Sequence, residues 1–128
     1  MPETQVLFFC DEKETPVRSW LVDMRKSDRR AYAKCIARLH LLAQLGHELR
    51  RPLADYLEQE IHELRIRRGR VNYRILYFFH GSDVAILTHG LIKEDKIPRA
   101  DLARAILRRN AFLSDPEKHT FEEDIPHA

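Results

Sequence analysis

The chain has 128 residues, of which 44% are hydrophobic and 33% charged, with 4 glycines and 6 prolines. This composition is typical of one globular domain with a single core, and it excludes a fibrous or wholly disordered chain. The first residues lack the basic and then apolar run of a signal peptide, and no apolar stretch approaches the roughly 18–20 residues that cross a bilayer. We therefore expect a cytoplasmic protein that does not enter a membrane.

The charges are distributed unevenly along the chain. Five of the 20 acidic residues but only one of the 22 lysines and arginines lie from Ser114 onward. Residues 1–113 therefore hold 21 basic and 15 acidic residues, a net charge of +6. A basic body favours a polyanionic partner, although an ordinary solvated surface would give the same totals. We expect a domain over residues 1–113 and a flexible acidic tail over residues 114–128.

The first half of the chain predicts one strand and two helices. Residues 5–10 (QVLFFC) form a short apolar run that is typical of a strand. Thr15 and Pro16 are typical of a helix start, and apolar residues then recur at intervals of three and four. A second helix is expected over residues 27–45, with Gly46 just past its end. The tight turn between the two helices predicts a helical hairpin.

The second half predicts an antiparallel sheet and a last helix. Residues 46–60 are interpreted as a loop. Three runs with strand character follow, at residues 61–68 (IHELRIRR), 71–79 (VNYRILYFF) and 84–92 (VAILTHGLI), and the turns between them favour a meander. Pro98 then opens a helix. The predicted fold class is α+β, with the helical hairpin packed on a small twisted antiparallel sheet and a C-terminal helix.

Arginines gather on the first two strands of the predicted meander and at the turn between them. Alternation along the first strand places Glu63 on the same face as Arg65. Guanidinium groups on a curved sheet can hold phosphates bidentately. The alternative interpretation is an exposed strand face whose arginines form ion pairs with Glu60 and Glu63. The arginines are Arg65, Arg67, Arg68, Arg70 and Arg74.

Two further candidate groups lie at the end of the third run. His89 interrupts an otherwise apolar strand, and an imidazole can transfer protons near neutral pH, although a strand histidine is more often structural and hydrogen-bonded. Gly90 beside it indicates a bulge or a close backbone approach. Lys93 and Lys96 follow, and they are suited either to phosphate binding or to local pairing with the two acidic residues between them.

Motifs for metal binding and nucleophilic catalysis are missing from the sequence. Cys10 and Cys35 lie in apolar stretches without metal-ligand spacing, which indicates buried, reduced thiols. There is no Gly-rich phosphate loop, no HExxH and no CxxC pair, and the serines and threonines have no nucleophile-elbow context. We therefore expect no metal site.

Three linked motifs carry a family resemblance. They are the E-x-R strand in EIHELRIRR, the Y-R-x-x-Y strand in VNYRILYFF, and the segment ILTHGLIKEDKIP before the closing helix. Together with the order of elements over about residues 5–113, they resemble the RelE/HigB branch of the RelE/ParE toxin superfamily, and most closely its phage-derived, HigB-like members. The resemblance implies a RelE-like fold, in which the helical hairpin covers one face of the sheet and the other face is concave and basic.

The resemblance also implies a function. Toxins of this branch cut mRNA in the ribosomal A site, inhibit translation, and are held inactive by a cognate antitoxin, which in HigB systems is typically a helix-turn-helix protein. The implied reaction is attack of a ribose 2′-OH on the scissile phosphate, without metal or cofactor. Such chemistry needs a base, cations for the phosphorane and an acid for the leaving oxygen. The expected partners are an antitoxin, the ribosome and mRNA.

The resemblance assigns roles to individual residues. Arg65 and Arg74 would clamp the phosphate, Lys93 would add positive charge, and His89 would transfer protons. Tyr73 or Tyr77 would stack on a base if exposed. The expected RNA-binding residues are Arg67, Arg68, Arg70, Tyr73 and Lys96.

The sequence departs from the family pattern at two points. Glu63 stands where the best-known RelE toxins have a lysine. HigB-like members often have a glutamate at this position. Glu94 and Asp95 lie between two lysines, which weakens local phosphate binding. Two alternatives to the endonuclease therefore remain: a ParE-like inhibitor of DNA gyrase, and a non-catalytic relative that binds an antitoxin. The acidic tail is also a candidate to mask the basic face in cis.

Overall fold

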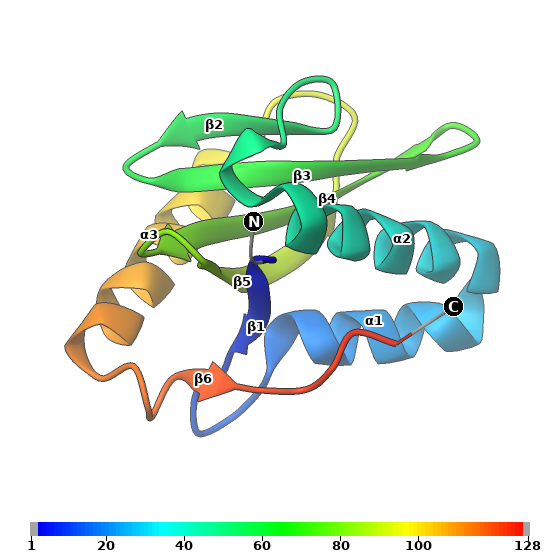
Figure 1. The fold of residues 1–128 in the computed structure, drawn as a ribbon. Coiled ribbons are helices and arrows are strands. Elements are labelled where there is room, and N and C mark those ends of the chain that lie inside the picture. Colours follow the sequence, from blue (N-terminus) through cyan, green and yellow to red (C-terminus); the bar gives the residue numbers. More distant parts are fainter. Residues whose placement is uncertain (1–2, 127–128) are drawn as a thin grey trace.

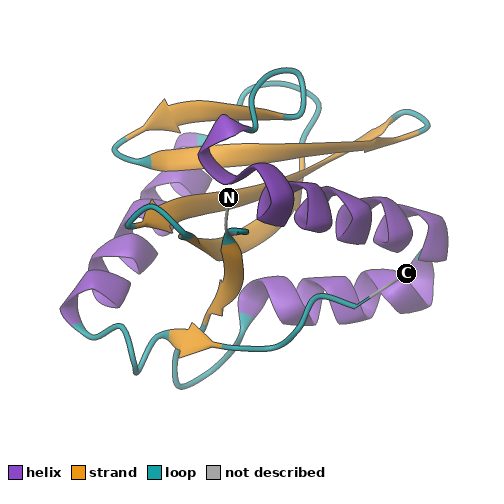
Figure 2. Cartoon of the chain, in the orientation of Figure 1, coloured by secondary structure: helices purple, strands orange, loops and turns teal. Residues whose placement is uncertain are grey.

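The computed structural model describes residues 3–126, which form helices on both faces of one mixed sheet (Figures 1 and 2). A helical hairpin covers one face and the last helix covers part of the other. In chain order the elements are β1 (Gln5–Phe9), α1 (Pro16–Ser27), α2 (Arg29–Leu45), a 3-10 turn (Gly46–Glu48), β2 (Ala54–Glu58), β3 (Ile61–Arg68), β4 (Val71–His80), β5 (Val84–Ile92), α3 (Arg99–Ser114) and β6 (Thr120–Phe121).

The helical hairpin is confirmed, and one residue makes its turn. The Asp28 backbone N–H donates to Met24 O at 2.7 Å and so ends α1. The Asp28 side chain accepts from Ala31 N at 3.1 Å and so caps the start of α2. Gly46, with a φ of 52°, ends α2 in a conformation that suits glycine. Because a single residue separates the helices, they run back along each other on the sheet.

The six strands are arranged in the order β2-β3-β4-β5-β1-β6. Strands β3, β4 and β5 form the expected antiparallel meander, and β2 adds a further antiparallel ladder to β3. The sheet as a whole is mixed, because β1 pairs in parallel with β5, from Gln5 beside Val84 to Phe8 beside Leu87. The expectation of a wholly antiparallel sheet is therefore wrong at this one ladder. The α+β class with a RelE-like arrangement of helices holds.

Residues 46–60 contain a strand that the sequence pattern did not predict. Strand β2 lies at the sheet edge, pairs with β3 alone among the strands of residues 3–126, and has a register shift between Tyr56 and Glu58. Of its five residues, only Ala54 is fully buried. An edge strand with one buried residue and a bulge shows no clear alternation of apolar and polar residues, which is why it reads as a loop.

A β-bulge in β5 sets which side chains face α3. Leu76 pairs with His89 and Tyr77 pairs with Leu87, so Thr88 is the extra residue. The bulge places His89 on the α3 face and Gly90 on the hairpin face. A Cβ atom at Gly90 would lie 2.5 Å from the Trp20 ring. Both features that the glycine indicated, a bulge nearby and a close approach, are present.

The acidic tail contacts the body of the protein. Strand β6 pairs with β1, and the rings of Phe8 and Phe121 lie 6.4 Å apart. Ile125 packs against the hairpin core, and Glu123 forms an ion pair with Arg18 at 2.5 Å. These contacts lie at the opposite edge of the sheet from β2 (Figure 1), away from β3 and β4. Within residues 3–126, no helix combines the length and apolar character of a membrane span.

Candidate functional site

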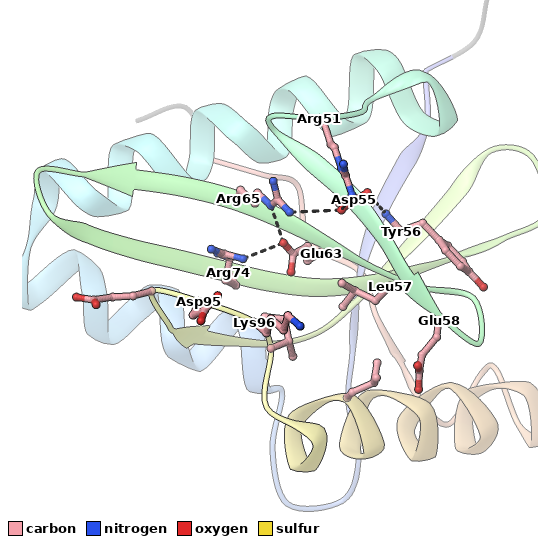
Figure 3. Close-up of a pocket in the computed structure, with 13 residues that line it drawn as sticks. Arg51, Asp55, Tyr56, Leu57, Glu58, Glu63, Arg65, Arg74, Asp95 and Lys96 are labelled. Carbon is pink, nitrogen blue, oxygen red and sulfur yellow. Dashed lines mark hydrogen bonds and ion pairs between the residues drawn. The ribbon is translucent and has the colours of Figure 1, made fainter.

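A cavity of about 550 Å³ opens on the α3 face, between β2, β3 and β4 and the loop before α3 (Figure 3). We call it the Glu63 cavity, after the carboxylate at its centre. Helix α3 contributes Leu102 to the wall but leaves the polar ends of these strands uncovered. Its charged lining consists of four cations and five anions: Arg51, Arg65, Arg74, Lys96, Asp55, Glu58, Glu63, Glu94 and Asp95.

Glu63 is 3% exposed and is held by two arginines. Its Oε1 atom accepts from Arg65 Nε at 2.6 Å and from Arg74 Nη1 at 2.8 Å. Arg65 and Arg74 lie directly opposite each other on β3 and β4, an arrangement that is destabilised by repulsion between the two positive charges. Glu63, two residues from Arg65 on the same face, reduces the repulsion between the two guanidiniums, and they in turn compensate the burial of its charge.

The charge pattern continues onto β2. Asp55 lies opposite Glu63 in the β2–β3 ladder, and its Oδ2 lies 3.4 Å from Arg65 Nη2 and 2.9 Å from Arg51 Nη2. The hydrogen bond from Arg51 lowers the pKa of Asp55 below its usual value. Like charges therefore face each other across the strands, while opposite charges pair along β3, between Glu63 and Arg65, and on the two diagonals to Asp55 and Arg74. The result is a chain of alternating charge from Arg51 to Arg74 (Figure 3).

Arg65 and Arg74 therefore form the ion pairs that were the alternative to phosphate binding. They still have unused donors, because a guanidinium carries five N–H groups. Arg74 makes one hydrogen bond, to Glu63, and its buried Nε has no partner within residues 3–126. The Arg74 side chain is 12% exposed, so these donors lie in a site largely shielded from water.

The other cations predicted for this surface are placed differently. Lys96 lines the Glu63 cavity from the loop side (Figure 3). Lys93 is exposed and does not line the cavity. Arg67 is exposed and donates to Gly69 O at 2.9 Å, and Arg70 is exposed at the same turn.

Three residues expected to bind RNA or to stack on a base face the helical hairpin instead. Arg68 Nε lies 3.1 Å from Asp28 Oδ1 at the hairpin turn. Tyr73 is 6% exposed and Tyr77 is 1% exposed, both in the hairpin core. Burial raises the pKa of both tyrosines. The condition for stacking on a base, an exposed ring, is therefore not met by Tyr73 or Tyr77.

Tyr56 is the aromatic residue that the sequence reading missed. The residue lines the edge of the Glu63 cavity, its ring lies on the His62 side of β2, and it is 50% exposed. The ring stands edge-on to His62, with centroids 5.2 Å apart. Recognising β2 as an edge strand would have been the signal, because a large aromatic side chain at a sheet edge beside arginines is typical of a stacking site.

His89 is placed beneath α3 and outside the lining of the Glu63 cavity. Its Nε2 lies 3.1 Å from Asp101 Oδ1 and its Nδ1 lies 3.2 Å from Thr88 Oγ1. Burial, more than any other cause, lowers its pKa to about 4, so the ring is neutral at physiological pH. This is the hydrogen-bonded, structural arrangement that was the alternative to a catalytic role.

Cysteines and acids in the described part of the chain show no sign of a metal centre. No three His, Cys, Asp or Glu side chains of residues 3–126 gather as a metal site. Cys10 and Cys35 are free thiols, and Cys35 is buried. Burial raises the pKa of Cys35 to about 12, so this thiol stays protonated.

The hairpin, the mixed sheet and the polar cavity on its open face define an α+β protein with a RelE-like fold. A family model described as "Phage derived protein Gp49-like (DUF891)" matches residues 22–110. The chain belongs to this family, which is part of the RelE/ParE-like toxin superfamily and is a family of toxin–antitoxin toxins. The matched residues include β2 to β5 and thus all the residues of the alternating-charge series from Arg51 to Arg74. No curated protein matches the sequence.

Proposed function

We propose that this protein is the toxin of a type II toxin–antitoxin pair and that it acts as a ribosome-dependent mRNA endonuclease. The observation that supports this function is the Arg65–Glu63–Arg74 cluster, which lies in a cavity large enough for a nucleotide. Two guanidiniums beside one carboxylate combine cationic groups for a phosphate with a proton acceptor, and these are two of the components that 2′-OH attack requires.

Glu63 is the group best placed to accept the 2′-OH proton. Its Oε1 binds both arginines, whereas its Oε2 has no hydrogen bond within residues 3–126. The free donors of Arg74 and Arg65 would stabilise the negative charge that develops on the phosphorane. Lys96 would add positive charge from the loop side of the cavity.

The charge balance of the cavity supports dependence on the ribosome. Five anions and four cations line it, so free RNA gains little electrostatic attraction there. A substrate already held in place by the ribosome avoids most of the entropic cost of binding. On this proposal the protein acts in the cytoplasm, needs no cofactor, and is held inactive by a cognate antitoxin, typically of the helix-turn-helix type.

The test is mRNA cleavage in a reconstituted translation system, with cut sites mapped by primer extension. We expect the wild type to cut translated mRNA but not free mRNA, and Glu63→Gln and Arg74→Ala to abolish cutting. Arg25→Ala, which changes an exposed residue of α1 on the hairpin face, is the matched control and should cut normally. Growth arrest with intact mRNA and trapped DNA gyrase would overturn the proposal in favour of the ParE-like alternative. A folded protein that does neither would be a non-catalytic relative.

A further inference from the structure

A second hollow, of about 480 Å³, adjoins the Glu63 cavity on the hairpin side of β2. We call it the β2-edge hollow. The two spaces share Arg51, Asp55 and Tyr56 in their walls, so they meet across the edge strand. The β2-edge hollow adds His47, Arg50 and His62.

The charge of this hollow differs from that of the Glu63 cavity. Its lining holds two arginines and one carboxylate, whereas the Glu63 cavity holds four cations and five anions. Arg51 pairs with that carboxylate, Asp55, at 2.9 Å. Arg50 is exposed, and within residues 3–126 its side chain has no ion pair. The hollow therefore presents an uncompensated guanidinium next to a site that is proposed to bind a phosphodiester.

The hollow also presents an aromatic surface. Tyr56 is 50% exposed, and its ring lies edge-on to His62 at 5.2 Å and 80°. His47 stacks on Phe79 at 3.7 Å, and the Phe79 ring in turn lies edge-on to His62 at 5.2 Å. Burial lowers the pKa of His62, so that ring is neutral near pH 7. A cation beside an exposed ring suits a unit made of one phosphate and one unstacked base.

We infer that the β2-edge hollow is a second RNA subsite, which holds the nucleotide next to the scissile linkage. Arg50 binds its phosphate and Tyr56 stacks on its base. The assignment rests on the proposed endonuclease function, in which the RNA strand that enters the Glu63 cavity also crosses β2. An acidic protein segment would suit Arg50 but would leave the exposed ring unused, and so RNA is the better match.

The first measurement compares cleavage kinetics on ribosomes. Arg50→Ala should raise KM and leave kcat unchanged, because Arg50 contacts only the flanking nucleotide. Tyr56→Ala should raise KM by about 5- to 150-fold, the range expected for one lost base stack. Tyr56→Phe, which keeps the ring but loses the hydroxyl that accepts from Glu60 N at 3.1 Å, should keep KM close to the wild-type value. Arg25→Ala, on α1, is the charge-matched control. Thermal unfolding of each variant verifies that it is folded.

The second measurement uses 2′-O-methyl oligoribonucleotides, which cannot be cut by 2′-OH attack. A hexanucleotide should bind more tightly than a dinucleotide, and Arg50→Ala should remove this gain and make the salt dependence shallower by about 0.7 in log–log slope. Unchanged KM in Arg50→Ala and Tyr56→Ala, with cleavage still dependent on Glu63, overturns the subsite alone. A wild type that neither cuts mRNA nor binds the hexanucleotide overturns the endonuclease and the subsite together. Loss of affinity for an acidic protein in Arg50→Glu, with cleavage unaltered, overturns the RNA assignment.

Discussion

His89 Nε2 lies 3.1 Å from Asp101 Oδ1, and this contact connects the bulge in β5 to the first turn of α3. The histidine is 6% exposed and is also bonded to Thr88. Helix α3 supplies one wall of the Glu63 cavity through Leu102. His89 therefore holds a wall of the site in place without contacting the space where a substrate would lie.

The neutral state of His89 predicts that the protein is less stable in acid. Its pKa is about 4 in the folded protein and about 6.5 in an unfolded chain, so the unfolded chain takes up a proton first as the pH falls. The stabilisation is fully present above pH 6.5 and is lost between pH 6.5 and 4, on the order of 3 kcal/mol. Urea unfolding at pH 7 and pH 4 should show a smaller loss in His89→Gln than in the wild type. His62→Gln is the comparison variant, since burial lowers the pKa of His62 too.

The same variant separates a structural role of His89 from proton transfer. If the ring transfers protons, His89→Gln will abolish cleavage on ribosomes at every pH while the protein stays folded. We expect instead that cleavage falls only in proportion to the fraction of unfolded protein, because His89 lies outside the cavity lining. Circular dichroism on the same samples measures that fraction.

The position of Glu63 between two arginines predicts that its negative charge contributes strongly to the stability of the fold. Glu63→Ala leaves two opposed guanidiniums, one of them only 12% exposed, without their shared counter-ion, and should lower the free energy of unfolding by about 3 kcal/mol. Arg74→Met in the same background removes one of the two charges and should recover part of the loss. A double-mutant cycle by urea denaturation measures the coupling. Additive effects of the two substitutions would mean that the pair does not interact.

Much of the fold could be predicted from the sequence, because periodic burial leaves a readable pattern. The hairpin follows from apolar spacing and from Asp28, and strands β3 to β5 from alternation and apolar runs. The parallel pairing of β1 with β5 could not, because β1 is nearly all buried and its pattern is the same for either direction. Strand β2 was missed because an irregular edge strand exposes most of its side chains.

The candidate site was predictable only in part. The shared face of Glu63 and Arg65 follows from alternation, and Arg74 follows from the turn between β3 and β4. The cross-strand register decides which arginines pair with a carboxylate. The pairing of Arg65 with Asp55 also depends on the register, and Asp55 lies on a strand that was not predicted. The exclusion of Tyr73 from the site follows from which face of β4 the helical hairpin covers, and the sequence pattern alone did not assign that face.

Gly90 predicts a steric requirement on the hairpin face. A Cβ at this position would lie 2.5 Å from the Trp20 ring, which packs edge-on against Tyr73. Gly90→Ala should therefore lower the free energy of unfolding by about 1–3 kcal/mol through overpacking. Trp20→Leu in the Gly90→Ala background makes room and should cost less than the sum of the two single changes. Strict additivity would show that the ring is not the obstacle.

The tail predicts a stability effect without an effect on RNA. Deleting residues 115–128 removes β6 from β1 and the packing of Phe121 and Ile125 on the core, which should lower the free energy of unfolding by about 2–4 kcal/mol. The newly exposed β1 edge should also promote self-association, measurable by light scattering. Glu123→Gln is the control, because its ion pair with Arg18 is exposed and its loss should change stability far less than the deletion does. Affinity for the 2′-O-methyl hexanucleotide should not change on deletion, because β6 and β2 lie at opposite edges of the sheet; a rise in affinity would instead support masking of the site by the tail.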